Sequence, residues 1–329
     1  MSRYTVLITD YAWPDLDIER SILKRIDANL VAAEQSDRDY LKEKIATSDA
    51  VMCNWIQIDR PLLEAATRLK IIARLGIGID SVDTSFCREK NILVGNNPDY
   101  CVTEVAEHAL AQILSIGRKI AFWHYETMHG RYQIQSGPQM WRMENQTVGI
   151  YGFGNTGIAL AKKVLGIGMN VIAYSQSRRN NLHGVTFVDR EELFRQSDYV
   201  SLHVPLLPQN QNLIGYDELC LMKPTASLIN TARGGLVDHA ALAKALSEDK
   251  IAGAALDVQV PEPPELNSAP YNDHRVLLTP HAAFISEESL IDLRKKAAEQ
   301  IVDCLSGRQP QNIVNGVTVE KTSRQTTQP

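Results

Sequence analysis

Residues 147–157 read Thr-Val-Gly-Ile-Tyr-Gly-Phe-Gly-Asn-Thr-Gly, a short apolar strand that runs directly into the pattern Gly-x-Gly-x-x-Gly. Gly152 permits a tight turn, Gly154 lets backbone approach a bound pyrophosphate, and Gly157 allows a helix to pack closely on the strand. Apolar residues then recur with helical spacing at Ile158, Leu160, Ala161, Val164 and Leu165. The stretch therefore predicts a cradle for a dinucleotide phosphate at a helix N-terminus. The alternative is a glycine-rich turn in an unrelated α/β protein.

The length and composition favour a two-domain globular protein. The chain has 329 residues, which exceeds the roughly 250–300 residues at which one hydrophobic core usually stops growing. Apolar residues make up 44% of the chain and charged residues 22%, which excludes wholesale disorder. The formal net charge of −5 argues against nucleic acid or an anionic membrane as the main partner.

The cysteines and the N-terminal residues bear on the cellular compartment. The five cysteines show no Cys-x-x-Cys pair and no spacing suited to zinc, so we expect free buried thiols in a reducing compartment. The first residues lack a long apolar stretch beside a cleavage site, and no run approaches the ~20 apolar residues of a membrane span. We therefore expect a cytoplasmic protein.

Short apolar runs alternate with helical patterns in two series, which predicts two parallel sheets with right-handed crossovers. The first series places strands at 4–8, 50–55, 69–73 and 92–95, and the second at 147–151, 170–174, 199–204, 226–230, 253–257 and 276–279. A long helix is expected from Val102 to about Ile120 between the two series, and a last helix from about Glu287 to Leu305, capped by Ser286.

Polar side chains follow three strands of the second series, where open α/β sheets bind their ligands. Arg233 follows an apolar strand and precedes two glycines, so its guanidinium suits a carboxylate through paired, charge-assisted hydrogen bonds. Asp257 and Glu262 follow the next strand, and His281 leaves the last strand through Pro280. A lone histidine is usually a surface residue without a catalytic role, but the arginine and the two carboxylates on the preceding strands favour such a role for His281.

These motifs, in this order, closely resemble the D-isomer-specific 2-hydroxyacid dehydrogenase family, over nearly the whole chain from about Thr5 to Val314. The resemblance implies two Rossmann-like parallel-sheet domains, a flavodoxin-like one for substrate and a Rossmann one for NAD(P), with a cleft between them. It implies a substrate-binding domain formed by residues 1–100 and 285–315, a dinucleotide-binding domain at 101–284 and a disordered tail at 316–329. It also implies a homodimer whose core includes the long interdomain helices and the segment around Trp123 to Trp141.

The resemblance also assigns site residues. It implies that Arg233, Glu262 and His281 are catalytic and that the amides of Ile77 and Gly78 hold the substrate carboxylate. The alternative is that Gly76 and Gly78 merely end a strand and bind no ligand. The residues that it assigns to the cofactor are Gly152, Gly154, Asn155, Thr156, Gly157, Ser175, Arg178, Arg179, Val204, Pro205, Thr231, Ala232 and Asp257.

These groups suffice for reversible reduction of a 2-oxo acid to a D-2-hydroxy acid without a metal. As hydride reaches the carbonyl carbon, His281 donates a proton to the oxygen and Arg233 stabilises the developing charge. Glu262 pairs with the other ring nitrogen of His281 and favours the charged imidazole. Histidine then acts as acid in reduction and as base in oxidation.

The chain departs from the usual NAD-binding pattern after the second strand of the dinucleotide-binding domain. An aspartate commonly accepts hydrogen bonds from the adenosine ribose there, but this chain has Ser175 followed by Arg178 and Arg179. The hydroxyl and the two cations suit a ribose phosphate. We therefore expect NADP(H) to be favoured over NAD(H), unless the arginines are only a solvated pair on a loop.

Within the family, residues 97–101 and 280–289 look most like the branch related to C-terminal binding proteins, which are dehydrogenase-fold transcriptional corepressors. This gives an alternative function, a nucleotide-sensing interaction protein. The chain lacks their long disordered extension, and its catalytic set is complete. The branch commonly has tryptophan where this chain has Phe284, which together with Trp55 lines the substrate pocket or is merely a core or lid residue.

Overall fold

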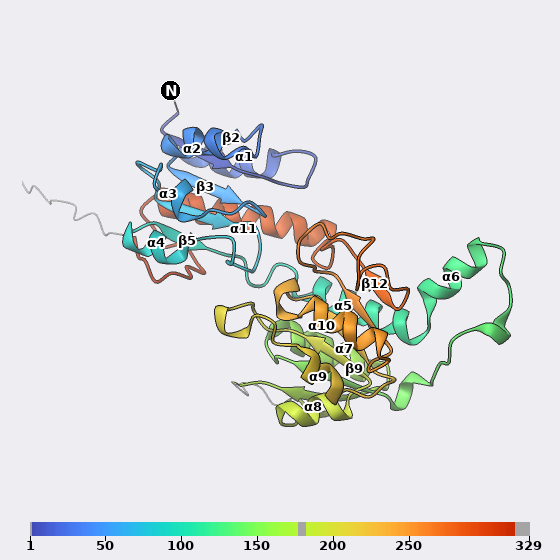
Figure 1. Ribbon diagram of the computed structural model, residues 1–329. Coiled ribbons are helices and arrows are strands. Elements are labelled where there is room, and N and C mark those ends of the chain that lie inside the picture. The colour runs from blue at the N-terminus through green and yellow to red at the C-terminus, as the bar shows by residue number, and fades with distance from the viewer. Residues whose placement is uncertain (1, 177–181, 320–329) are drawn as a thin grey trace, which may run out of the picture. The chain divides into compact units, whose positions relative to one another are not determined.

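The structure is a computed structural model that describes residues 2–176 and 182–319. The chain divides into two compact units (Figure 1). The first unit runs from the N-terminus to Tyr100 and resumes at Ser286, and the second runs from Cys101 to Ile285. Each unit is built on its own parallel sheet, which confirms the predicted α/β class with two parallel-sheet domains.

The described part of the first unit holds a five-stranded sheet in the order β2-β1-β3-β4-β5, with every pairing parallel. The strands are β1 (Tyr4–Ile8), β2 (Ala28–Ala32), β3 (Ala50–Cys53), β4 (Ile71–Arg74) and β5 (Leu93–Gly95). The helices are α1 (Asp17–Leu23), α2 (Arg38–Ala46), α3 (Arg60–Leu63), α4 (Thr84–Glu89) and α11 (Glu287–Leu305).

The first sheet is buried on both faces, as its nearly continuous apolar strands require. Leu7, Val51 and Ile72 pack in one core cluster with side chains of α2, α3 and α4. The α11 helix packs against α1 and β4. It begins as predicted, because the Ser286 side chain accepts the Ser289 N–H.

The described part of the second unit holds a seven-stranded parallel sheet in the order β12-β11-β10-β9-β6-β7-β8. The strands are β6 (Thr147–Tyr151), β7 (Asn170–Tyr174), β8 (Val185–Phe187), β9 (Tyr199–Leu202), β10 (Ser227–Asn230), β11 (Gly253–Leu256) and β12 (Val276–Leu278). The helices are α5 (Val102–Gly117), α6 (Ile120–Met128), α7 (Asn155–Gly166), α8 (Arg190–Gln196), α9 (Tyr216–Leu221) and α10 (His239–Ser247).

Two core clusters flank the second sheet and show how its helices are layered. One cluster joins side chains of α5 and α7 to Val148, Ile150 and Val171. The other joins side chains of α8, α9 and α10 to Val200 and Leu228. Since successive side chains of a strand point to opposite faces, helices cover the sheet on both sides, as in doubly wound folds.

The structure corrects three sequence-based expectations. The helix predicted from Val102 to about Ile120 ends at Gly117, and a further helix that was not predicted, α6, begins at Ile120 after Lys119, whose backbone is left-handed with φ of 54°. The edge strands β2 and β8 were not predicted. The cysteines are free, but Cys220 is exposed on α9 rather than buried.

The segment from α6 to residue 146 stands apart from the core of its unit. In Figure 1, α6 lies away from the strands of the seven-stranded sheet, and no residue of this helix is buried. Large apolar side chains are exposed along it: Ile120, Tyr125, Met128, Tyr132, Ile134, Met140 and Trp141. We call residues 120–146 the arm.

The remaining features concern membrane-spanning helices and the C-terminal tail. No helix among residues 2–176 and 182–319 is long and apolar enough to cross a membrane. Of the tail predicted to be disordered, residues 320–329 lie outside the described residues, and Val317 is buried.

Candidate active site

The glycine loop between β6 and α7 needs its glycines for steric reasons. Gly152 has a φ of 100°, and a Cβ there would lie 2.4 Å from the carbonyl oxygen of His203. A Cβ on Gly157 would lie 2.4 Å from the carbonyl oxygen of Gly152, whereas a Cβ on Gly154 would meet nothing within 4 Å. Gly152 and Gly157 are therefore required by the packing of the fold, and open space remains above Gly154.

The α7 helix begins without a side-chain cap, because its N-cap residue is Gly154. The first amides of a helix have no partner within the helix and carry a partial positive charge. An uncapped helix start above open space suits a bound phosphate group. The positions predicted for the cofactor at Asn155 and Thr156 form this first turn.

Other residues predicted for the cofactor lie at neighbouring strand ends. Val204, which follows β9, has its Cγ1 atom 2.6 Å from where a Gly152 Cβ would stand, so it borders the glycine loop, and Pro205 follows it. After β10, the Thr231 hydroxyl is buried without a partner among the described residues. The Ala232 N–H donates to the Asn230 side chain at 3.0 Å. Ser175 follows β7 directly.

The two arginines that carried the cofactor prediction, Arg178 and Arg179, lie outside the described residues. The predicted preference for NADP(H) therefore stays a prediction.

Arg233 begins the turn after β10, in an extended conformation. Its Nη1 atom donates to the Ala232 carbonyl at 2.8 Å, and its charge contributes to a low pKa at Glu262. A Cβ on Gly234 would lie 2.2 Å from the carbonyl oxygen of Gln259. The glycine after Arg233 thus lets the turn after β10 approach the loop after β11, which carries Glu262.

His281 and Glu262 form a hydrogen-bonded pair, with 2.9 Å between His281 Nδ1 and Glu262 Oε2. The other carboxylate oxygen of Glu262 accepts the Gln259 N–H at 2.9 Å. Burial alone would raise the pKa of Glu262, but the hydrogen bond from His281, its charge and the Gln259 amide together lower that pKa below its usual value. The glutamate is therefore held as a carboxylate, and both side chains keep some exposure to solvent.

The backbone of His281 is left-handed, with a φ of 54°, which is uncommon for a residue other than glycine. Its N–H donates to the Asp257 carbonyl at 2.7 Å. The ring of Phe284 meets the His281 ring edge-on, with 6.2 Å between centroids. Phe284 is thus a direct neighbour of the predicted proton donor.

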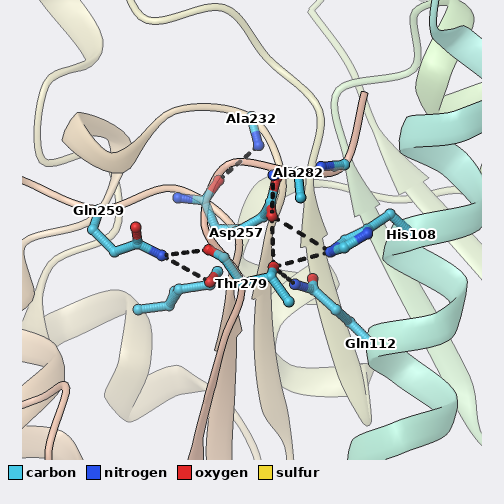
Figure 2. Close-up of polar contacts among 10 residues, drawn as sticks. His108, Gln112, Ala232, Asp257, Gln259, Thr279 and Ala282 are labelled. Atoms are coloured by element: carbon cyan, nitrogen blue, oxygen red, sulfur yellow. Dashed lines mark hydrogen bonds and ion pairs between the residues drawn. The ribbon is translucent and has the colours of Figure 1, made fainter. Parts of the chain in front are cut away.

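Asp257 was predicted to lie near the nicotinamide, and the structure places its carboxylate in the interior, fully buried. Its oxygens accept the Thr279 hydroxyl and the N–H groups of Ala282 and Ala283 (Figure 2). Asp257 therefore contacts the turn directly after His281.

Sequence reasoning missed the side chains that fix these loops. Gln259 donates to the carbonyls of Leu256 at 2.9 Å and Thr279 at 3.1 Å, which joins the ends of β11 and β12 (Figure 2). The Tyr271 hydroxyl donates to the Val260 carbonyl at 3.0 Å. Thr279 carried a signal, because it directly precedes Pro280 and His281, whereas nothing in the sequence marked Tyr271.

The first unit holds the predicted carboxylate loop at the end of β4. The Asn96 side chain donates to the Ile77 carbonyl at 2.6 Å, and the Asn97 side chain donates to the Arg74 carbonyl at 2.9 Å. Gly76 has a φ of 152°, and a Cβ there would lie 1.1 Å from Arg74 Nη1. The loop leading to Gly78 is therefore shaped by side chains that contact its backbone.

Trp55 follows β3 in the same unit and is 44% exposed. Its N–H donates to the Asp10 carboxylate at 2.6 Å. Trp55 is thus no core residue, and its backbone is fixed by a charged group of the neighbouring strand end.

No group of three or more His, Cys, Asp or Glu side chains in the described parts of the chain is arranged to hold a metal ion. The polar groups that the second unit gathers are those of an acid–base pair with an arginine nearby.

The model of the family described as D-isomer specific 2-hydroxyacid dehydrogenase, NAD binding domain, matches residues 110–283. A glyoxylate reductase from Thermococcus litoralis is 37% identical over 288 residues, which cover 84% of this chain and 87% of that protein. The chain belongs to the D-isomer specific 2-hydroxyacid dehydrogenase family. This membership confirms the resemblance seen in the sequence and the prediction of an NAD(P)-dependent oxidoreductase.

Solved structures of this family share the fold. A D-lactate dehydrogenase from Aquifex aeolicus, complexed with NAD and lactic acid, has a TM-score of 0.85 and 26% identity, covering 94% of this chain and 99% of that one. An NADPH-dependent glyoxylate/hydroxypyruvate reductase from Sinorhizobium meliloti, complexed with NADP and malonate, has a TM-score of 0.84 and 27% identity, covering 97% and 99%. Proteins that share this fold have thus been solved with either cofactor.

Proposed function

We propose that this member of the family reduces a 2-oxo acid to a D-2-hydroxy acid and prefers NADPH as reductant. The observation that carries the proposal is the hydrogen-bonded pair of His281 and Glu262, at 2.9 Å. Arg233 lies close enough to lower the pKa of Glu262. A histidine held by a carboxylate, with a guanidinium nearby, is an arrangement that suits proton transfer to a polarised carbonyl.

The proton-transfer roles follow from the pair. Because Glu262 accepts from Nδ1–H, Nε2 is the His281 nitrogen that exchanges a proton with substrate. In reduction, Nε2–H gives its proton to the carbonyl oxygen, while the Glu262 carboxylate holds the ring in place through Nδ1. Arg233 binds the substrate carboxylate and offsets charge that develops on the carbonyl oxygen. In oxidation, the neutral Nε2 removes the hydroxyl proton.

The residues of the second unit fit a nicotinamide dinucleotide. Gly152, Gly154 and Gly157 with the first turn of α7 would hold the pyrophosphate, because that turn is uncapped and open space lies above Gly154. Val204, Pro205, Thr231 and Ala232 would border the cofactor, and the unpartnered Thr231 hydroxyl offers it a hydrogen bond. The bound nicotinamide supplies the hydride.

The preference for NADPH rests on Ser175, which stands where a carboxylate would repel a ribose phosphate, and on the charges of Arg178 and Arg179. The NADPH-dependent reductase from Sinorhizobium meliloti supports this part of the proposal.

The 2-oxo acid would be held by its carboxylate on the amides of Ile77 and Gly78 and on Arg233. Trp55 and Phe284 would contact its side chain. The similarity to proteins named glyoxylate reductase supports a small 2-oxo acid as the substrate of this chain.

We also propose that the protein is a homodimer joined through the arm and that it acts in the cytoplasm. Soluble monomers rarely expose contiguous apolar patches beyond a few hundred Å². The arm exposes Tyr132 at 86%, Ile134 at 77% and Met128 at 71%. Light scattering on the purified protein should give twice the mass of the 36.7 kDa chain. In a Tyr132→Asp/Ile134→Glu variant, the measured mass should fall toward that of a single chain.

The test of the activity is steady-state oxidation of NADPH and NADH, in parallel, against glyoxylate, hydroxypyruvate, pyruvate and branched or aromatic 2-oxo acids. The proposal expects rapid turnover with at least one acid and a higher kcat/KM with NADPH. Tight binding of both cofactors without turnover of any acid would instead favour a nucleotide-sensing interaction protein on the same fold.

A further inference from the structure

Two polar residues interrupt the apolar face of α5. Gln112 is only 3% exposed, and its neighbours along the helix, Ala109 and Ile113, are fully buried. His108 stands one turn earlier on the same face, with 23% of its side chain exposed. Burying polar side chains among apolar ones is unfavourable unless they are hydrogen-bonded, so this pair requires an explanation.

Both side chains point at Thr279, as Figure 2 shows. His108 Nε2 lies 3.0 Å from the Thr279 hydroxyl oxygen, and Gln112 Nε2 donates to the same oxygen at 3.2 Å. The hydroxyl in turn donates to Asp257 Oδ1 at 2.5 Å. A hydroxyl has one proton and accepts through its lone pairs, so its proton goes to the carboxylate and His108 Nε2 must carry the hydrogen.

Asp257 also binds the backbone of the loop that carries His281. Its Oδ1 accepts the Ala282 N–H and its Oδ2 accepts the Ala283 N–H, each at 2.9 Å. The Asp257 carbonyl accepts the His281 N–H at 2.7 Å. Three consecutive amides, beginning at His281, are therefore bound by one residue.

His281 needs this support because its backbone has a φ of 54°. A left-handed conformation costs a non-glycine residue energy, and it persists only where the surroundings over-determine it. The bonds to Asp257 do so. The Asp257 carboxylate is itself contacted by the Thr279 hydroxyl and, at 3.5 Å, by His108 Nε2, while Gln112 contacts that hydroxyl.

We propose that His108 and Gln112 are positioning residues for the reaction: through the Thr279 hydroxyl and the Asp257 carboxylate they hold the backbone from which the His281 ring reaches the substrate. The inference rests on the proposed function of His281. Neither α5 residue contacts the His281 ring; both act through the loop.

A purely structural role is the competing explanation, and the network itself argues against it. Replacing all the members of a buried polar network by apolar side chains of similar volume is often neutral for stability. Gln112 Oε1 moreover has no partner among the described residues, so the amide is an inefficient way to fill the core. What the network provides and apolar packing cannot is a fixed orientation of Asp257.

The test compares matched variants in kcat, in the Kd for NADPH and in thermal unfolding. Thr279→Val keeps the volume and removes the hydroxyl, whereas Thr279→Ser keeps the hydroxyl. His108→Leu and Gln112→Leu remove the donors, and His108→Gln keeps one. Ile113→Ala, on the same helix but outside the network, is the control for lost stability alone.

We expect Thr279→Val and His108→Leu to lower kcat by about 10- to 100-fold, since a displacement of about 1 Å can cost a reaction 100-fold. The Kd for NADPH should change by less than about threefold in these variants. Thr279→Ser and His108→Gln should have kcat values closer to that of the wild type. Ile113→Ala should unfold at a lower temperature but keep the wild-type kcat. Folded Thr279→Val with wild-type kcat would overturn the inference, as would equal losses in kcat and NADPH binding.

The outcomes separate this inference from the proposed function. If the wild-type protein turns over no 2-oxo acid, the proposed function fails. If it turns over and the network variants match it, only the inference about α5 fails. If His108→Leu does not fold, the isosteric Thr279→Val decides alone.

Discussion

The carboxyl ends of the two sheets differ in how they use their polar side chains. In the first unit these side chains shape the backbone. The Asp10 carboxylate accepts the N–H groups of Asn54, Trp55 and Ile56, and the Asn96 amide donates to the carbonyl of Ile77.

In the second unit, Asp257 and Gln259 also bind loop backbone, but the strand ends present charged side chains as well. Arg233, Glu262 and His281 follow β10, β11 and β12, which are neighbours in the sheet. His281 and Glu262 bond to each other and stay partly exposed. The comparison teaches that one sheet architecture can present its strand ends in two ways. Under the proposed function, the first edge would bind a carboxylate through its backbone and the second would move a proton.

The largest effect should come from the second edge. Replacing His281 with alanine removes the proton donor, and general acid catalysis contributes roughly 10²- to 10⁴-fold. We expect kcat to fall by about that factor while the Kd for NADPH, measured by fluorescence titration, stays near the wild-type value. Equal losses in turnover and cofactor binding would mean that His281 only supports the fold.

The second-largest loss of activity should come from Arg233→Lys. Lysine keeps the charge but offers no planar fork for a carboxylate. Hydrogen bonds to charged groups contribute about 1.5–3 kcal/mol, so kcat/KM for the 2-oxo acid should fall by about 10- to 100-fold. Wild-type kcat/KM in this variant would show that a point charge suffices and that no paired contact is made.

Gly76→Ala probes the first edge. The new Cβ must displace the Arg74 guanidinium, which donates to the Leu75 carbonyl at 2.8 Å. The amides of the loop should shift, and KM for the acid should rise by about tenfold, the cost of one weakened charged hydrogen bond. Gly307→Ala, which also has a positive φ but open space, is the matched control. A change in NADPH binding instead of KM would contradict this division of tasks.

Ser175→Asp should have a smaller effect, confined to cofactor choice. The new carboxylate can accept hydrogen bonds from ribose hydroxyls and repels a ribose phosphate. The ratio of kcat/KM with NADPH to that with NADH should fall severalfold, about 1 kcal/mol of discrimination. An unchanged ratio would show that Ser175 does not face the ribose.

The smallest effect should be on acid stability. Since the pKa of Glu262 is lower in the folded chain than its usual value of about 4.3, the folded state binds fewer protons there. This contribution is complete above the unfolded pKa and is lost as the pH falls through the lower folded pKa. Urea unfolding should therefore show Glu262→Gln less stable than wild type near pH 7, with the difference shrinking toward pH 3. A constant difference would rule out this titration.

The sequence predicted the parts of the fold that depend on local pattern. The strand Thr147–Tyr151, the helix after Gly154 and the Ser286 cap stand as predicted, because apolar periodicity, glycine and a capping hydroxyl act within a few residues. The end of the helix predicted near Ile120 lies at Gly117, but the helix that follows it, α6, was missed. The edge strand β2 was missed because half-exposed edges lack a continuous apolar run.

The residues that support the site were harder to predict. The sequence marked His281 by its place after a strand and a proline, but not its left-handed backbone. It identified an apolar stripe on α5 but could not show that His108 and Gln112 face Thr279, more than 160 positions later. Contacts between elements distant in sequence depend on packing, which periodicity does not encode.

The most direct test of the account is the stereochemistry of the product. The purified protein is incubated with NADPH and the 2-oxo acid that turns over fastest among those giving a chiral product, and the hydroxy acid is resolved by chiral chromatography. We expect one mole of the D-2-hydroxy acid for each mole of NADPH oxidised, and a rate of product formation lower by about 10²- to 10⁴-fold with His281→Ala. Formation of the L-enantiomer, or undiminished product from the His281→Ala variant, would contradict it.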